Sequence, residues 1–106
     1  MILAEFYRTN GNNLVGFSIS GHADMAEYGQ DIACASVSSA VMLTVNTITD
    51  VFNIKAKTKV LENDILLKLT DDPNGDGDRL LLGLVAHLYL LCEEFPGAVK
   101  VKITEK

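Results

Sequence analysis

Cysteine is scarce in this chain, which has two cysteines among 106 residues. Two thiols are too few for the disulfide framework of a small secreted protein, and we expect both to be reduced. The sequence also lacks internal repeats, low-complexity tracts and linkers, so repeat architectures and multidomain arrangements are excluded. The chain length and an apolar content of 48% predict one domain, residues 1–106, with a core that needs no structural metal.

Two further absences concern targeting and membranes. The first four residues carry no basic segment and run directly into a strand-like pattern, so we predict no signal peptide. The longest apolar run, Leu80 to Cys92, is too short to span a bilayer and contains His87. We therefore expect a cytoplasmic protein with no membrane partner.

Excess positive charge is also missing, because the formal net charge is −5. This balance disfavours nucleic acid as a partner, since phosphate contacts require a basic face, and it favours a basic substrate or partner. No cofactor motif is present, and we expect neither a cofactor nor a metal. The segment Asp72 to Gly77 imitates the start of a calcium loop, but Gly83 stands where a bidentate glutamate is required. We interpret this segment as an exposed acidic turn.

Alternating apolar and polar residues predict five strands, and apolar residues at three- and four-residue steps predict two helices. The expected strands are 1–8, 14–20, 55–60, 65–70 and 99–104, and the expected helices are 31–52 and 79–95. The order is therefore ββαββαβ. The fold class is α+β: a mainly antiparallel five-stranded sheet with both helices on one face. In the second strand, Val15, Phe17 and Ile19 are expected to share one face.

The outer side of the second helix and one face of the third strand have unusual compositions. The second helix is apolar nearly all round, and one sheet face cannot cover all of it, so we predict a homodimer. Lys55, Lys57 and Lys59 share one face of the third strand. We interpret them as a solvated surface that discourages pairing at a sheet edge. His87 and Cys92 lie five residues apart on a helix, so they face different directions and form no metal pair.

The chemistry-bearing residues cluster between the second strand and the first helix. Asp31 is expected to be the N-cap of that helix, which places Cys34 at its third position, where free amides and the macrodipole favour a thiolate. His22, in the preceding loop, can act as the base for this thiol and later protonate a leaving amine. Free amides near Ala33 and Cys34 would form an oxyanion hole. Asp31 caps the helix, orients His22, or does both.

The residues alone leave other interpretations open. A cysteine on an apolar helical stripe is commonly a small core residue, and a loop histidine is commonly part of the polar surface. A redox sensor using Cys34 is a further alternative, although no resolving cysteine lies nearby in the sequence. Ser36, Ser38 and Ser39 lack a partnered base, which disfavours a serine nucleophile.

Three pieces of this region are familiar together: Gly21-His22-Ala23, then Tyr28-Gly29, then the segment DIACASVS at 31–38. They resemble the ribosomal-processing cysteine protease family, Prp. The resemblance implies a cytoplasmic, homodimeric endopeptidase that removes a short N-terminal extension from large-subunit ribosomal protein twenty-seven. It implies an apolar pocket for a phenylalanine beside the reactive thiol.

The resemblance also implies roles for single residues. The family cysteine corresponds to Cys34, its histidine to His22 and the motif aspartate to Asp31. Gly21, Ala33 and Ser38 are the expected substrate-binding residues. The alternative function is a non-enzymatic, dimeric ribosome-assembly factor that binds the same basic protein without cutting it.

Overall fold

The computed structural model describes residues 1–9, 11–21, 28–62 and 64–105. The elements in chain order are β1 (Ile2–Arg8), β2 (Leu14–Ser20), α1 (Tyr28–Asn46), η1 (Thr47–Val51), β3 (Lys55–Val60), β4 (Asp64–Asp71), α2 (Asp76–Glu94) and β5 (Val99–Glu105). The segment η1 is a π-helical continuation of α1. The predicted order ββαββαβ is therefore confirmed.

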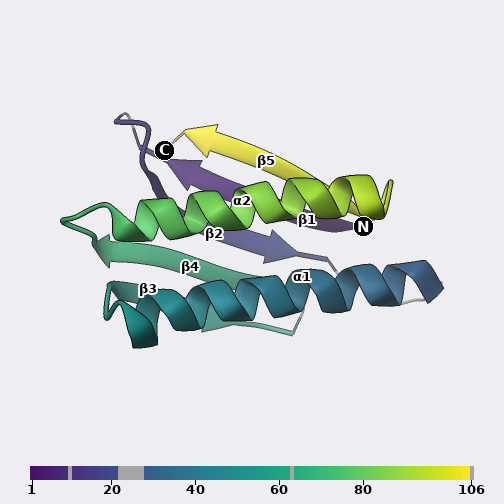
Figure 1. The fold of residues 1–106 in the computed structure, drawn as a ribbon, viewed down its shortest axis with the longest axis horizontal. Coiled ribbons are helices and arrows are strands. Elements are labelled where there is room, and N and C mark those ends of the chain that lie inside the picture. Colours follow the sequence, from purple (N-terminus) through teal and green to yellow (C-terminus); the bar gives the residue numbers. More distant parts are fainter. Residues whose placement is uncertain (10, 22–27, 63, 106) are drawn as a thin grey trace.

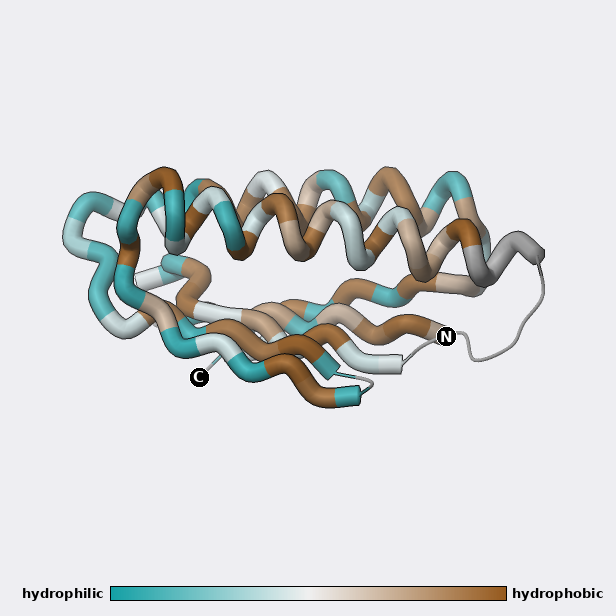
Figure 2. The backbone as a smooth tube through the Cα atoms, turned by 90° about the horizontal axis from the view of Figure 1, so that it is seen from below, coloured by the Kyte–Doolittle hydropathy of each residue, from teal (hydrophilic) through white to brown (hydrophobic). Residues whose placement is uncertain are grey.

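The five strands form one sheet in the order β3-β4-β2-β1-β5. Its neighbouring strands are antiparallel, except for the parallel pair β1 and β5. Helix α1 connects β2 to β3 and helix α2 connects β4 to β5, and both lie along the same face of the sheet (Figures 1 and 2). The predicted α+β architecture is confirmed.

The core lies between the helices and this covered face. The rings of Phe6 and Phe17 lie 5.8 Å apart at its centre and are fully buried. The helices contribute fully buried side chains to this core, namely Leu81 and Leu88 of α2 and Val41 of α1. Full burial of a side chain of this size contributes about 1.5–3 kcal/mol. The apolar residues that alternate in β1, and those that recur at three- and four-residue steps in α1 and α2, all pack into this single core layer.

A β-bulge in β2 makes the prediction wrong for one residue of its buried face, Val15. Val15, Phe17 and Ile19 were expected to share the buried side of β2, but Val15 is only half-buried and Leu14 takes its place in the core. The register between β1 and β2 shifts at Tyr7 and Arg8. One extra residue at a bulge moves the side chains beyond it to the opposite face.

The first helix begins earlier than predicted. It starts at Tyr28, so Asp31 lies inside it and is not its N-cap. Gly29 favoured a loop at this position, but one glycine in a helix costs only about 1 kcal/mol, which the packing of the later turns outweighs. The predicted end is confirmed, because Asn53 adopts the left-handed conformation, with φ of 54°, directly after the helical segment.

The second helix also begins earlier, at Asp76 and not at Arg79. Its first turn is held by Asp72, whose carboxylate accepts hydrogen bonds from the amides of Gly77 (2.9 Å) and Asp78 (3.0 Å). The side chain of Asp78 accepts a hydrogen bond from the amide of Leu14 at 2.7 Å. The acidic segment therefore caps a helix and ties it to the bulged strand.

The helical segment Ile32–Val51 is apolar and long enough, by length and composition, to cross a membrane. A helix that covers a sheet in a globular domain passes the same test. Val37, Val41 and Ile48 of this segment are buried against the sheet.

Candidate active site

Cys34 lies on α1, on the side that faces the sheet. Its side chain is half-buried, packs against the core and lines a small cavity of about 30 Å³. The other residues around this cavity come from β1, β2, β4, α1 and the position directly after β2. They are Ile2, Ile19, Gly21, Val37, Ser38, Val41 and Ile65. The thiol is thus at the margin of the core, between apolar walls and solvent.

Gly21 determines how the chain leaves β2 beside this cavity. Its φ is +88°, which side-chain-bearing residues rarely adopt. A Cβ atom at this position would collide with the carbonyl oxygen of Met1. Glycine therefore allows the chain to pass close to the start of β1 and to line the same cavity as Cys34. His22 is the next residue in the sequence and lies outside the described residues.

The expected oxyanion hole at Ala33 and Cys34 requires correction. Because α1 begins at Tyr28, both residues lie in its second turn. The amides without helical partners are those of the first turn, and the macrodipole also acts mainly there. Ala33 is moreover fully buried in the core. The free-amide argument for Ala33 therefore does not apply, and a substrate contact at Ala33 stays a prediction.

Ser38 and Asp31 are the two other predicted site residues on α1. Ser38 follows Cys34 by one helical turn and lines the same cavity, so the two side chains are neighbours. The predicted contact between the side chain of Asp31 and His22 lies outside the part of the chain that the structure describes.

The second thiol has a different environment. Cys92 donates a hydrogen bond to the carbonyl oxygen of Val99 at 3.3 Å. Burial raises its pKa, and the negative charge of the adjacent Glu93 adds to this effect. A protonated thiol with a fixed acceptor is a structural group, as the sequence predicted for Cys92.

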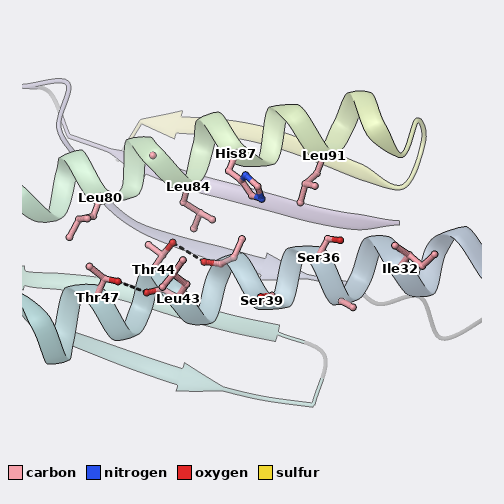
Figure 3. A pocket seen from close by; sticks show the side chains of 13 residues that line it. Ile32, Ser36, Ser39, Leu43, Thr44, Thr47, Leu80, Leu84, His87 and Leu91 are labelled. Carbon is pink, nitrogen blue, oxygen red and sulfur yellow. Dashed lines mark hydrogen bonds between the residues drawn. The ribbon is translucent and has the colours of Figure 1, made fainter.

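A larger groove of about 910 Å³ runs between α1 and α2 on the outer side of the helices (Figure 3). His87 lines it together with Ser36 and Ser39 of α1. No hydrogen bond joins His87 to either serine among the described residues, so nothing marks a serine nucleophile here. No metal-binding cluster of histidine, cysteine or acidic residues occurs in the described ranges.

Sequence reasoning missed the walls of the Cys34 cavity. The alternation of apolar and polar residues in the strands placed Ile2, Ile19 and Ile65 on inward faces. It did not show that the three side chains would surround the same residue of α1, Cys34. The strand order β4-β2-β1 supplies that information. One available signal was overlooked: no lysine or arginine occurs between residues 9 and 54, the region that contains both Cys34 and His22.

Comparison with known proteins identifies the family of this chain. The model of the family described as cysteine protease Prp matches residues 1–100. The ribosomal processing cysteine protease Prp of Bacillus subtilis (strain 168) is 40% identical over 48 residues, which span 45% of this chain and 43% of that protein. The Prp of Staphylococcus aureus (strain Mu50) is 25% identical over 97 residues, covering 90% of this chain and 92% of that protein.

Solved structures show the same fold. The essential ribosomal processing protease Prp from S. aureus, in complex with a substrate peptide, superposes with a TM-score of 0.89 at 21% identity, covering 97% of this chain and 99% of that chain. SMU.848 from Streptococcus mutans superposes with a TM-score of 0.81 at 28% identity, covering 100% of this chain and 96% of that chain. Because the family model matches residues 1–100, the chain belongs to the cysteine protease Prp family.

Proposed function

We propose that this protein is a cysteine endopeptidase in which Cys34 is the nucleophile and His22 its base. The observation that carries the proposal is the shared cavity of Cys34 and Gly21, because Gly21 is joined directly to His22. A half-buried thiol at the edge of the core is accessible to a peptide and shielded from bulk water on its other side. Ser38 and Gly21 border this thiol and would contact a bound peptide.

The chemistry follows from these groups. The imidazole of His22 takes the proton of the Cys34 thiol, and the sulfur attacks the scissile carbonyl carbon. Collapse of the tetrahedral intermediate breaks the C–N bond, and the imidazolium gives its proton to the leaving amine. Water then attacks the thioester, with the imidazole as base, and releases the acid product and the free thiol. Asp31 is proposed to orient His22.

The proposed substrate is a basic ribosomal protein, specifically the N-terminal extension of large-subunit ribosomal protein twenty-seven. Its support is charge complementarity. Residues 9–54 carry no positive side chain and contain Asp24, Glu27, Asp31 and Asp50. Such a region attracts lysine- and arginine-rich chains and repels acidic ones. A cytoplasmic location, where ribosomal proteins are made, is part of the proposal.

The experiment uses a peptide that spans the extension junction of that ribosomal protein. Mass spectrometry of the incubated peptide should show two fragments with wild-type protein and none with Cys34→Ala. Cys92→Ala is the matched control and should cleave within about threefold of wild type. Cleavage that survives Cys34→Ala would refute the nucleophile assignment. Tight peptide binding by wild-type protein without any fragment would favour the non-enzymatic assembly factor.

We also propose that the protein is a homodimer through its helical layer. Large apolar side chains lie exposed on the outer sides of both helices, including Leu43 (69% exposed) and Leu90 (61% exposed). The groove between the helices is lined mainly by apolar groups. A second copy that covers this surface would remove it from water at about 25 cal/mol per Å².

Light scattering during size-exclusion chromatography tests the dimer. Wild-type protein should elute with twice the chain mass of 11.5 kDa, and Leu43→Gln with Leu90→Gln should shift it toward one chain mass. Val60→Gln is the matched control, because Val60 is 70% exposed on the edge strand β3. A monomeric mass for wild-type protein at micromolar concentration would contradict the proposal.

A further inference from the structure

The sheet face opposite the helices, here called the open face, is positively charged. No element among the described residues covers it (Figure 2). Strand pairing places the outward residues of neighbouring strands in rows, and five exposed lysines lie in these rows: Lys57, Lys59, Lys68, Lys100 and Lys102. The acidic side chains in the same rows are Glu5 and Asp64. A chain of net charge −5 thus concentrates positive charge on one face.

Within the described ranges these lysines form no ion pair shorter than 4.0 Å, although Lys102 lies opposite Glu5 on the neighbouring strand. The ion pairs among the described residues join Arg8 to Glu105 and Arg79 to Asp76, and neither includes a lysine of the open face. Lys57 and Lys68 are direct cross-strand partners. Like charges in this position destabilise a sheet by a few tenths of a kcal/mol or more, because the ammonium groups repel each other. An anion bound between them would remove this repulsion.

The surface between the lysines is neither flat nor purely polar. A hollow of about 710 Å³ lies over β1, β2, β3 and β4 and is bordered by Tyr7, Lys57, Lys59 and Lys68. Tyr7 pairs across the strands with Gly16, which pairs with Lys68. The Tyr7 hydroxyl donates a hydrogen bond to the Glu5 carboxylate at 3.4 Å. The Tyr7 ring offers a stacking surface, and the lysines on the border of the same hollow offer phosphate contacts.

We propose that the open face binds single-stranded RNA, with the lysines contacting phosphates and Tyr7 stacking on a base. Sheets that present aromatic and cationic side chains bind unpaired nucleotides in this way. An acidic peptide would satisfy the charges but would leave the Tyr7 hollow without a planar partner. The negative net charge that disfavoured nucleic acid describes the whole chain, whereas the charge on this face has the opposite sign. The proposal is independent of the peptidase proposal, because Cys34 lies on the covered side of the sheet.

Fluorescence anisotropy with a labelled twelve-nucleotide uridine RNA tests it. Wild-type protein should bind, and the logarithm of the association constant should fall with the logarithm of salt concentration, with a slope of about −0.7 per phosphate contact. Lys68→Gln should reduce the slope by about 0.7, and Tyr7→Leu should weaken binding about tenfold. The triple variant of Lys57, Lys59 and Lys68 to glutamine should abolish binding.

The controls separate this surface from general electrostatics. Arg79→Gln removes the same charge from α2, on the other side of the sheet, and should leave both affinity and slope unchanged. Circular dichroism verifies that each variant is folded, and peptide cleavage should be unaffected. Retained binding in the triple variant, an equal loss in Arg79→Gln, equal binding of a duplex RNA, or equal competition by polyglutamate would each overturn the proposal.

Discussion

The two cysteines fall in the same range of burial and have different neighbours. Both side chains are half-buried, and both lie on helices that cover the same sheet face. Cys34 borders a cavity that it shares with Gly21 and Ser38, whereas Cys92 donates a hydrogen bond to Val99 and lies beside Glu93. Burial alone therefore does not distinguish the proposed nucleophile from the packed thiol, and the difference lies in the surrounding groups.

The environment of Cys92 opposes formation of its thiolate. Burial and then the charge of Glu93 raise the pKa of Cys92, so this sulfur stays protonated at neutral pH. Cys34 instead borders the small cavity that Gly21, the residue before His22, also lines. The account assigns nucleophilic chemistry to Cys34 and packing to Cys92.

The largest expected effect is on the rate of peptide cleavage and distinguishes the two histidines. His22→Ala should reduce peptide cleavage by about 10³-fold, because it removes the proposed general base. His87→Ala is the matched control and should cleave within about threefold of wild type, because His87 lies in the groove between the helices, away from the Cys34 cavity. The measurement is the initial rate of fragment formation by chromatography. Equal losses in the two variants would show that the assignment of the base is wrong.

Two glycines provide the second test. Gly21→Ala should destabilise the protein by about 2 kcal/mol or more, because alanine is strained at positive φ and its methyl group would collide with Met1. Gly83→Ala, in open space on α2, should stabilise it by up to about 1 kcal/mol. Urea denaturation measures both changes. A neutral Gly21→Ala would contradict the described path beside Cys34.

A smaller effect separates the two thiols by stability. Cys92→Ala should cost about 1 kcal/mol, because it removes a packed group and the hydrogen bond to Val99. Cys34→Ala should cost less, since its side chain already borders a cavity of about 30 Å³. Urea denaturation of both variants at pH 7 checks the order. A larger stability loss for Cys34→Ala would place it with the structural thiols.

The smallest expected effect is a pH dependence. The pKa of Cys92 is raised in the folded state above the ordinary thiol value of 9.0. The unfolded chain therefore releases this proton first, so the stability from Cys92 is present below that value and is lost as pH rises through the folded-state pKa. Wild-type protein should lose stability relative to Cys92→Ala as the pH rises above the ordinary thiol value of 9.0. An unchanged difference would show that the Cys92 environment is misread.

The sequence predicted most of the fold because each strand and helix buries one face. It did not predict the bulge at Val15, since the extra residue is visible only in the pairing with β1. It placed the start of α2 too late because the cap comes from Asp72, four residues before the helix. Local patterns do not reveal a cap that folds back from a preceding turn.

The candidate site was predicted in part. The short segment around Cys34 gave the family, because its residue types are specific, and Cys34 stays the proposed nucleophile. The geometry of that segment was harder to predict, since the start of α1 at Tyr28 depends on the packing of its later turns against the sheet. The cavity walls come from three separate strands, and only strand order unites them. The charge of the open face was likewise hidden by the net charge of the chain.

The most direct measurement is the rate at which each cysteine is alkylated. Folded wild-type protein is treated with iodoacetamide at pH 7.5, and the labelled peptides are quantified by mass spectrometry over time. The account predicts that Cys34 is labelled at least about tenfold faster than Cys92, and that His22→Ala slows Cys34 alone. Equal labelling of the two thiols, or faster labelling of Cys92, would contradict the assignment of Cys34 as the nucleophile.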